Sequence, residues 1–343
     1  MERGAHLVGS TPFDSASTAM RTALDRLGPR LRTLPDGETG ERRNWIIHII
    51  ESLREHPDLE VRREGDWSDY DRTLTYRIRP GRHLDGRTLD FGHVLAFEES
   101  FPLFEKLRDE HDRPDLAFQV GIPGDFDMAL FTLGPTGALL HRWPFTVATL
   151  REIHAIHRHG GGDVVFQLEI PAELVAVTSL PDPARPLVAA YLARGIAALA
   201  TRSPEGTRFG LHLCLGDMNH RALGRMKDVR PLVLLANAIV RRWPEGRPLE
   251  FLHAPLAAGE DPPPREPAFY APLSRLRLPS TTRFIAGLVH EDRTVAEQEE
   301  LVRLIEGLLG RSVDVAASCG LGRRRLEDAL ATMERAAALC SAS

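Results

Sequence analysis

Metal-ligating side chains stand in two widely separated segments of the chain. His212 and Cys214 end an apolar run that begins at Phe209, and Cys319 follows the apolar run 313–317. Successive side chains of a strand point to opposite faces, so His212 and Cys214 are expected to share one face. Mixed thiolate and imidazole ligands are typical of zinc, which can hold and activate a thiol. The alternative interpretation is two packed thiols and one core histidine.

Short apolar runs alternate with helical patterns through the second half of the chain. The strand-like runs occupy residues 163–168, 208–214, 249–253, 283–289 and 313–317. The helical patterns occupy residues 186–200, 231–243, 268–276, 294–309 and 325–339. Repeated strand–helix units imply a parallel sheet, either closed into a barrel or doubly wound.

Polar residues recur at the ends of these runs, which favours the barrel. Three earlier candidates, 6–10, 32–36 and 117–122, bring the strands to eight. A (β/α)8 barrel builds its active site at the carboxyl ends of all its strands. The sequence therefore predicts a single α/β domain, a TIM barrel spanning residues 1–343. The strand-end residues are Ser10, Asp36, Gly121, Glu169, His212, Cys214, His253, His290 and Cys319.

Two polar segments near the expected mouth of the barrel are candidates for substrate contacts. Asp36 and Glu38 follow the second strand candidate, where acidic groups would bind a substrate amine or transfer protons. The alternative there is a turn followed by a capped helix start. Asp125 lies in a Gly- and Pro-rich loop after the third candidate, which suits substrate positioning or, alternatively, an N-cap.

The stretch from residue 61 to residue 94 departs from the strand–helix rhythm. It is rich in Arg, Asp and Tyr, its side chains alternate over 73–78, and Pro80-Gly81 is a turn signal. This pattern predicts a β-hairpin insertion that lies over the barrel mouth.

Composition excludes several classes of protein. The net charge of -5 argues against nucleic-acid binding, which depends on a basic surface. No apolar run is long enough to span a membrane. Three cysteines are too few for a disulfide framework and fit a reducing compartment. We therefore expect a cytoplasmic protein with small-molecule partners, and a homodimer is left open.

Four segments follow a pattern known from one enzyme family. Residues 8–12, Val-Gly-Ser-Thr-Pro, are similar to the family's Ile-Gly-Ser-Phe-Pro strand end, and residues 166–172 are similar to its Ile-Gln-Ile-Asp-Glu-Pro-Ala strand. His212-x-Cys214 matches its zinc motif, and residues 318–324 match its Asp-Cys-Gly-Leu-Lys-Thr-Arg segment. In order and spacing the chain thus resembles the catalytic barrel of the cobalamin-independent methionine synthases.

The resemblance implies roles for several of these residues. In that family zinc binds homocysteine as a thiolate and methyltetrahydrofolate donates the methyl group. The resemblance implies His212, Cys214 and Cys319 as zinc ligands, Ser10 as a contact to the amino-acid substrate, and His290 as a proton-transfer residue. Glu169 ends the matched strand and is the best acidic candidate.

The chain departs from the family at two positions. The family's fourth zinc ligand is a Glu after the sixth strand, whereas here His253 lies nearer the strand end than Glu250 does. His253 is therefore the expected fourth ligand and Glu250 its competitor. The family's pair of carboxylates after Gln is reduced to Glu169, which Ile170 follows. These departures leave the thiol and the alkyl donor open.

The function predicted from these residues is zinc-dependent alkyl transfer, such as methyl transfer, involving a thiol substrate. Zinc lowers the pKa of a bound thiol, and an acid such as His290 or Glu169 would protonate the leaving group. One alternative is a zinc-free lyase like uroporphyrinogen decarboxylase, which needs an arginine-lined pocket. Another is a non-catalytic barrel with a structural zinc. Metal analysis and ligand exchange with thiols separate the three.

Overall fold

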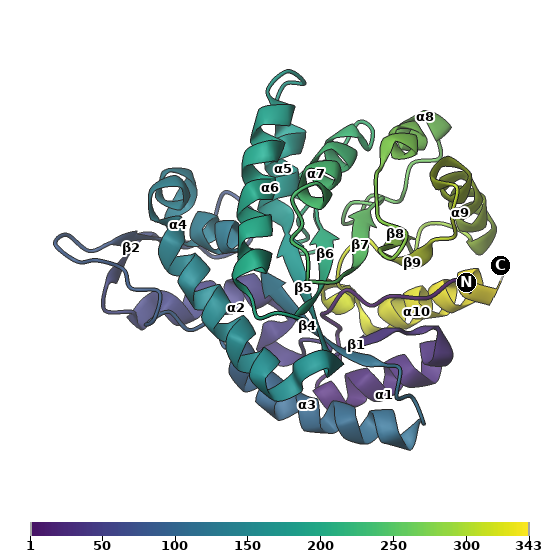
Figure 1. Cartoon of the computed structure of the whole chain (residues 1–343), viewed down its shortest axis with the longest axis horizontal. Helices are drawn as coiled ribbons and strands as arrows, with labels where there is room; N and C mark the ends of the chain where they lie inside the picture. Colours follow the sequence, from purple (N-terminus) through teal and green to yellow (C-terminus); the bar gives the residue numbers. More distant parts are fainter. Residues whose placement is uncertain (1, 342–343) are drawn as a thin grey trace.

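The computed structural model describes residues 2–341 and is built around a curled parallel sheet (Figure 1). Its strands are β1 (Thr33–Pro35), β4 (Ala117–Pro123), β5 (Val164–Ile170), β6 (Arg208–Leu213), β7 (Leu249–Pro255), β8 (Arg283–Val289) and β9 (Asp314–Ala317). They follow one another across the sheet in chain order, and every neighbouring pair is parallel. The carboxyl ends of all these strands therefore lie at one end of the sheet.

The N-terminal segment lies between the two edges of the sheet. Ala5 forms parallel bridges with Leu31, beside β1, and with Val315 in β9. The Ala5 amide donates to the Arg30 carbonyl at 3.0 Å, and the His6 amide donates to the Val315 carbonyl at 2.9 Å. No strand forms over the first expected range, residues 6–10, and Ala5 just before it makes the bridges, whereas the other seven expected strands are confirmed.

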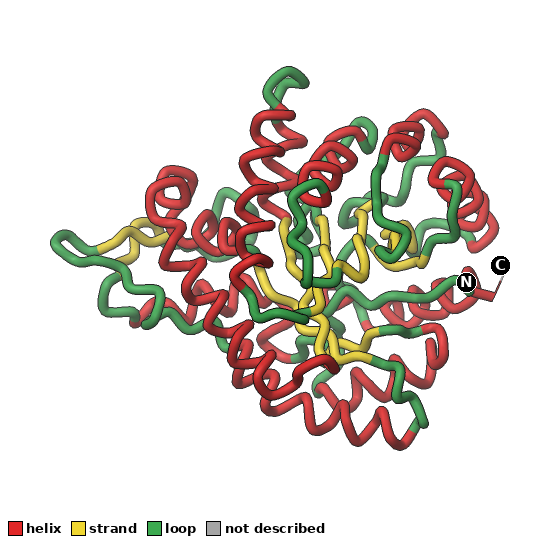
Figure 2. The backbone as a smooth tube through the Cα atoms, in the orientation of Figure 1, coloured by secondary structure: helices red, strands yellow, loops and turns green. Residues whose placement is uncertain are grey.

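Helices surround the strands (Figure 2). They are α1 (Ala16–Leu27), α2 (Trp45–Ser52), α3 (His93–Glu110), α4 (Asp125–Gly160), α5 (Pro171–Ser179), α6 (Arg185–Arg202), α7 (Arg230–Val240), α8 (Pro267–Tyr270), α9 (Val295–Leu309) and α10 (Leu326–Ser341). The long helix α4 bends at Gly134 and His141, close to Pro135 and Pro144, because proline removes a backbone donor and blocks the preceding turn. Within the described part of the chain, no helix is long and apolar enough to cross a membrane.

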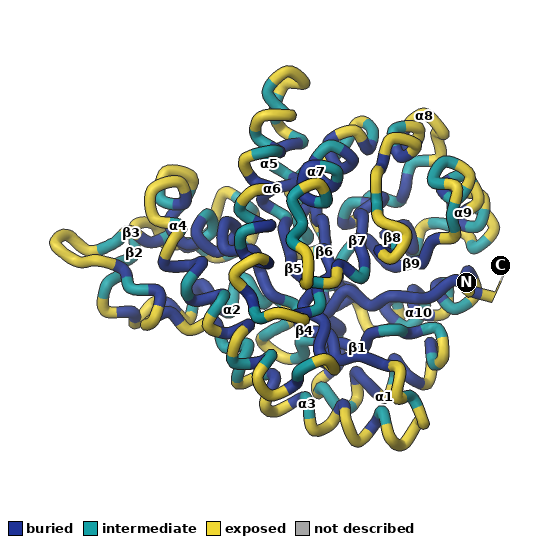
Figure 3. Tube along the Cα trace, in the orientation of Figure 1, coloured by how far each residue is buried: buried dark blue, intermediate teal, exposed yellow. Residues whose placement is uncertain are grey.

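Burial is concentrated in the strands (Figure 3). All seven residues of β5 are buried, as expected for a parallel strand that is covered on both faces. A small separate cluster of buried apolar residues comes from β4, β5, β7, β8 and β9: Ala117, Val165, Phe251, Ile285 and Ala316. Gly210 is needed beside this cluster, because a Cβ there would lie 2.1 Å from Cζ of Phe251.

Buried polar side chains form a hydrogen-bonded group beside this apolar cluster, where the His6 ring lies 4.7 Å from the ring of Phe251. Thr33 donates to Gln119 Oε1 at 2.7 Å, and Gln119 Nε2 donates to the Leu7 and Val8 carbonyls at 2.9 and 2.8 Å. His6 Nε2 lies 3.0 Å from Gln167 Oε1. These bonds satisfy buried polar groups and hold the N-terminal segment inside the curl.

The expected hairpin is present. β2 (Leu59–Arg63) pairs antiparallel with β3 (Thr75–Ile78). The loop between them reaches the segment after β6, where Asn219 Nδ2 donates to the Trp67 carbonyl at 3.0 Å. Tyr70 Oη donates to the Arg221 carbonyl at 3.0 Å and accepts from the Met218 amide at 2.8 Å. The hairpin therefore covers the carboxyl end of β6.

Candidate metal centre

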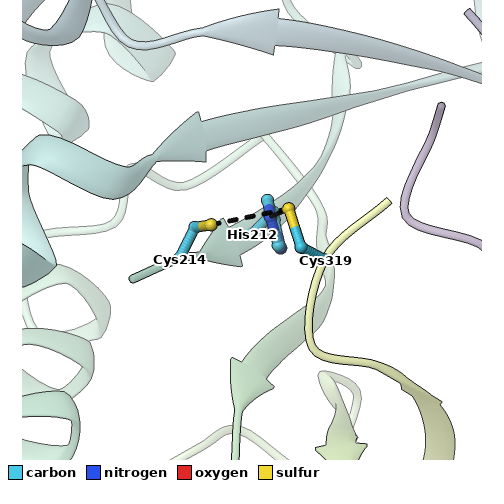
Figure 4. A group of neighbouring side chains, drawn as sticks. All are labelled: His212, Cys214 and Cys319. Atoms are coloured by element: carbon cyan, nitrogen blue, oxygen red, sulfur yellow. Dashed lines mark hydrogen bonds between the residues drawn. The ribbon is translucent and has the colours of Figure 1, made fainter. Parts of the chain in front are cut away.

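Three potential zinc ligands meet at the carboxyl ends of β6 and β9 (Figure 4). His212 and Cys214 come from the end of β6, and Cys319 comes from the turn after β9. Cys214 Sγ lies 3.7 Å from Cys319 Sγ, and Cys319 Sγ lies 3.8 Å from Nε2 of His212. One donor atom from each residue lies within 4.8 Å of the other two, which is close enough for all three to bind one ion.

A hydrogen-bonded pair of histidines fixes how His212 presents its ring. His253 Nε2 lies 2.9 Å from the Ala317 carbonyl, so this nitrogen must donate. His253 Nδ1 must then accept, and it lies 2.8 Å from His212 Nδ1, which donates. His212 Nε2 is left with its lone pair on the side of the two sulfurs. This is the tautomer that a metal requires.

The surroundings keep both rings neutral. Burial lowers the pKa of His253 to about 4. Burial, followed by the proximity of His253, holds the pKa of His212 well below its usual range. Gly287 makes room for this pair, because a Cβ there would lie 2.7 Å from His253 Nε2.

The structure does not bring either expected fourth ligand to the sulfurs. His253 pairs in register with His212, but both of its ring nitrogens are already engaged. Glu250 lies near the start of β7 and forms an ion pair with Arg208 at the opposite end of the strands. Three of the four expected donors are therefore assembled, and His253 lies behind His212.

Arg323 is a further member of this site, which the sequence analysis did not single out. Its guanidinium donates to Cys319 Sγ at 3.1 Å and to Ser10 Oγ at 2.8 Å, and Asp217 Oδ2 lies 3.3 Å away. A hydrogen bond from Cys214 and the charge of Arg323 lower the pKa of Cys319. The same hydrogen bond and burial raise the pKa of Cys214. Only its place in the matched Cys-Gly-Leu segment hinted at this role for Arg323.

Two carboxyl groups meet beside the sulfurs. A Cβ at Gly121 would lie 2.8 Å from Glu38 Oε1 and 3.0 Å from Glu169 Oε1, so both oxygens share the space above this glycine. Burial and the nearby Cys319 raise the pKa of Glu169 to about 8. Burial and Glu169 raise the pKa of Glu38 well above its usual range. The pair therefore retains a proton at neutral pH.

The two carboxylates and the three metal donors belong to adjoining cavities. A cavity of ≈ 750 Å³ is lined by Glu169, His212, Cys214 and Cys319. A neighbouring cavity of ≈ 580 Å³ is lined by Asp36 and Glu38, and Trp45 lines both. Asp36 accepts from Arg42, Ser100 and the Glu38 amide, at 2.6, 3.0 and 2.9 Å. It thus shapes the segment that carries Glu38.

Asp125 and His290, two of the residues expected to act on substrate, line neither cavity. Asp125 is buried, and its oxygens accept from Arg142 at 2.6 and 2.9 Å and from Thr146. His290 Nε2 lies 3.2 Å from the Gly259 carbonyl, and its Nδ1 accepts from the Asp292 amide at 3.2 Å. Local partners occupy both side chains, so the expected shared pocket does not include them.

His290 instead belongs to a second group of potential metal ligands, with His220 and Glu291. His220 Nε2 lies 3.1 Å from Glu291 Oε1, and His290 Nδ1 lies 3.7 Å from Glu291 Oε2. Arg324 Nε lies 3.1 Å from each oxygen of the same carboxylate. An arginine therefore already occupies the only anionic group of this cluster.

Comparison with known proteins supports the fold. No protein-family model matches the sequence, and no curated protein matches it. A B12-independent methionine synthase from Shewanella sp. W3-18-1, solved with selenomethionine, is similar in structure with a TM-score of 0.63 at 13% identity, over 100% of this chain and 98% of that one. A methyltransferase from Methanosarcina mazei is similar with a TM-score of 0.55 at 13% identity, over 99% and 94%. The chain thus shares the fold of a methionine synthase and of a methyltransferase.

Proposed function

We propose that the protein is a zinc-dependent enzyme that transfers an alkyl group, such as a methyl group, to a thiol. We further propose that its sheet forms a closed (β/α)8 barrel. The observation that carries the proposal is the set His212, Cys214 and Cys319 at the wall of a cavity, with the His212 tautomer fixed by His253. Closed structural sites take four protein ligands, whereas catalytic sites keep one position open.

The donor set fits zinc. Two sulfurs and one imidazole nitrogen are the ligands that this borderline-soft ion prefers, and His253 supplies the outer hydrogen bond that usually orients a ligating histidine. When bound there, zinc lowers the pKa of a substrate thiol and so supplies a thiolate near neutral pH. The proposed fourth ligand is therefore the substrate sulfur rather than His253 or Glu250.

The residues around the sulfurs would then orient the substrate. The Glu38–Glu169 pair can accept hydrogen bonds from a substrate amine. Arg323, which lines the cavity and donates to the buried Ser10, can bind a substrate carboxylate. A thiol carrying both groups, such as an amino-acid thiol, satisfies all of these side chains.

The alternative decarboxylase-like activity has less support. A polycarboxylate substrate requires several free arginines. Among the described residues that line the larger cavity, Arg323 is the only arginine, which is fewer than a polycarboxylate requires.

The decisive experiment is a thiol panel with zinc-loaded protein. Homocysteine, cysteine and small thiols without an amine or carboxylate would be tested with several methyl donors, and products would be identified by mass spectrometry. We expect S-methylation of an amino-acid thiol that is lost in Cys319→Ser and retained in Cys340→Ser, since Cys340 lies in α10, away from both cavities. Transfer that persists without zinc would contradict the proposal.

A further inference from the structure

The larger cavity has an unusually aromatic lining. Trp45, Trp67, Tyr70 and Phe131 all line it beside Glu169 and the two sulfurs. The whole chain has only 4 Trp and 4 Tyr, so half of its tryptophans gather in this one place. They come from three separate parts of the fold, namely α2, the hairpin and α4. All four are partly exposed, which leaves ring surface available to a ligand.

Trp67 is held in this position against its backbone preference. Its φ is 56°, in the left-handed region that bulky residues rarely adopt. Its indole nitrogen donates to Glu51 at 2.8 Å, its amide donates to the Arg72 carbonyl at 3.1 Å, and its carbonyl accepts from Asn219. Backbone strain that several contacts maintain is typical of binding sites.

The charges of the cavity favour a cation over an anion. Asp217 lines it with a side chain only 1% exposed, and its Oδ1 has no hydrogen-bond partner among the described residues. Glu169 is the second acidic side chain of this lining. Arg323 is the only arginine among the described residues of the lining, and Asp217 lies 3.3 Å from its guanidinium. Aromatic faces next to acidic groups are how proteins bind quaternary ammonium and related onium ions.

From this lining we propose that the alkyl donor is a small onium compound, a sulfonium or a quaternary ammonium, bound against Trp45, Trp67, Tyr70 and Phe131. This proposal rests on the proposed function, because it names the second substrate of the same site. In the reaction a sulfur–carbon bond forms between the thiolate and the donor methyl group. The methyl–onium bond breaks, and its electron pair leaves with a neutral thioether or tertiary amine. Charge is conserved without a proton, so no general acid is needed at the leaving group.

The test compares a cation with a neutral molecule of the same shape. Choline and 3,3-dimethylbutan-1-ol differ in that carbon replaces the charged nitrogen. Isothermal titration calorimetry of zinc-loaded protein should show choline binding about tenfold more tightly than the alcohol, since the attraction of a cation to desolvated ring faces is of that order. Equal affinity for the two compounds in the wild-type protein would overturn the proposal.

Variants locate the binding. Trp67→Leu should remove most of the preference for choline, whereas Trp67→Phe should retain part of it. Trp143→Leu is the matched control, because Trp143 is 59% exposed and does not line the cavity. Tyr70→Leu tests the same site if Trp67→Leu folds poorly. A preference for choline that survives both Trp67→Leu and Tyr70→Leu would place the cation elsewhere and refute the assignment.

A transfer assay separates this proposal from the one on which it rests. With trimethylsulfonium as donor, the expected products are the S-methyl thioether and dimethyl sulfide. Methylation of the thiol only by an anionic or neutral donor would refute the onium proposal and leave zinc-dependent transfer standing. Selective choline binding in a protein that holds no zinc would support the onium site and contradict zinc-dependent transfer.

Discussion

Two clusters of histidine and acidic or sulfur ligands lie at the same end of the sheet, yet only one is suited to a metal. In both, three donor atoms lie within 4.8 Å of one another. Around His212 the outer contact is a neutral histidine that accepts a hydrogen bond from Nδ1, which leaves the ligating nitrogen free. Each cluster also contacts an arginine. Arg323 donates to one of the two sulfurs and is offset by Asp217, whereas Arg324 lies 3.1 Å from both oxygens of Glu291, the one carboxylate of the second cluster. The partners behind the ligands, rather than the spacing of the ligands, distinguish the two clusters.

The largest effect should follow from removing a ligand in the first cluster. We expect wild-type protein to retain one zinc per chain through purification, and Cys214→Ser together with Cys319→Ser to retain none, because two of the three anchoring donors are lost. Inductively coupled plasma mass spectrometry measures the zinc content. The matched change in the second cluster, Glu291→Gln, should leave the content unchanged. Zinc loss in Glu291→Gln with retention in the double serine variant would reverse the comparison.

A smaller effect should follow from removing the outer histidine. His253→Ala leaves the His212 Nδ1–H without its acceptor, and outer contacts of this kind typically contribute about 10- to 100-fold to metal affinity. Competition with a chromophoric chelator measures that affinity. His290→Gln serves as the control, since His290 contacts neither sulfur. If His253→Ala abolishes zinc binding altogether, as a lost ligand would, then His253 is a direct ligand after all.

The first cluster should also make the zinc-free protein sensitive to acid. The folded pKa of His253 is about 4, below the unfolded value of 6.5, so the unfolded chain binds more protons between these values. The free energy of unfolding is therefore unaffected by His253 above pH 6.5 and falls as the pH drops toward 4. At pH 5 this one residue lowers it by about 2 kcal/mol. Urea unfolding of zinc-free protein at pH 7.5 and pH 5 measures the loss. The loss should shrink in His253→Gln, and an unchanged loss in that variant would exclude His253 as its source.

The smallest effect should come from releasing the second cluster. In Arg324→Met the Glu291 carboxylate loses its cation, so His220, His290 and Glu291 become able to hold a second, weaker zinc equivalent. Titration of the zinc-loaded variant with further zinc measures this second site. Arg335→Met is the matched control, because Arg335 contacts only the backbone carbonyl of Glu291. No second equivalent in Arg324→Met would show that charge is not what keeps this cluster empty of metal.

The sequence predicted the sheet well, because each strand is a local apolar run and strand–helix alternation dictates parallel pairing. It placed His212 and Cys214 on one face correctly, since that follows from alternation within one strand. It could not show that His253 pairs in register with His212, because register depends on contacts between strands. Nor could it show that Asp125 is engaged by Arg142, a partner from further along α4. Position at a strand end indicated which residues are near the site but not which are free to act.

The bridge at Ala5 has a consequence for the order of folding. It joins residues 5 and 315, so its formation closes almost the whole chain into a loop, and long loops are entropically unfavourable and slow to close. The consecutive strand pairs need much shorter closures and can form earlier. β9 receives its second neighbour only when the N-terminal segment docks, and the Ala317 carbonyl that orients His253 belongs to β9. We therefore expect the metal centre to be completed late in folding, after most of the sheet has assembled.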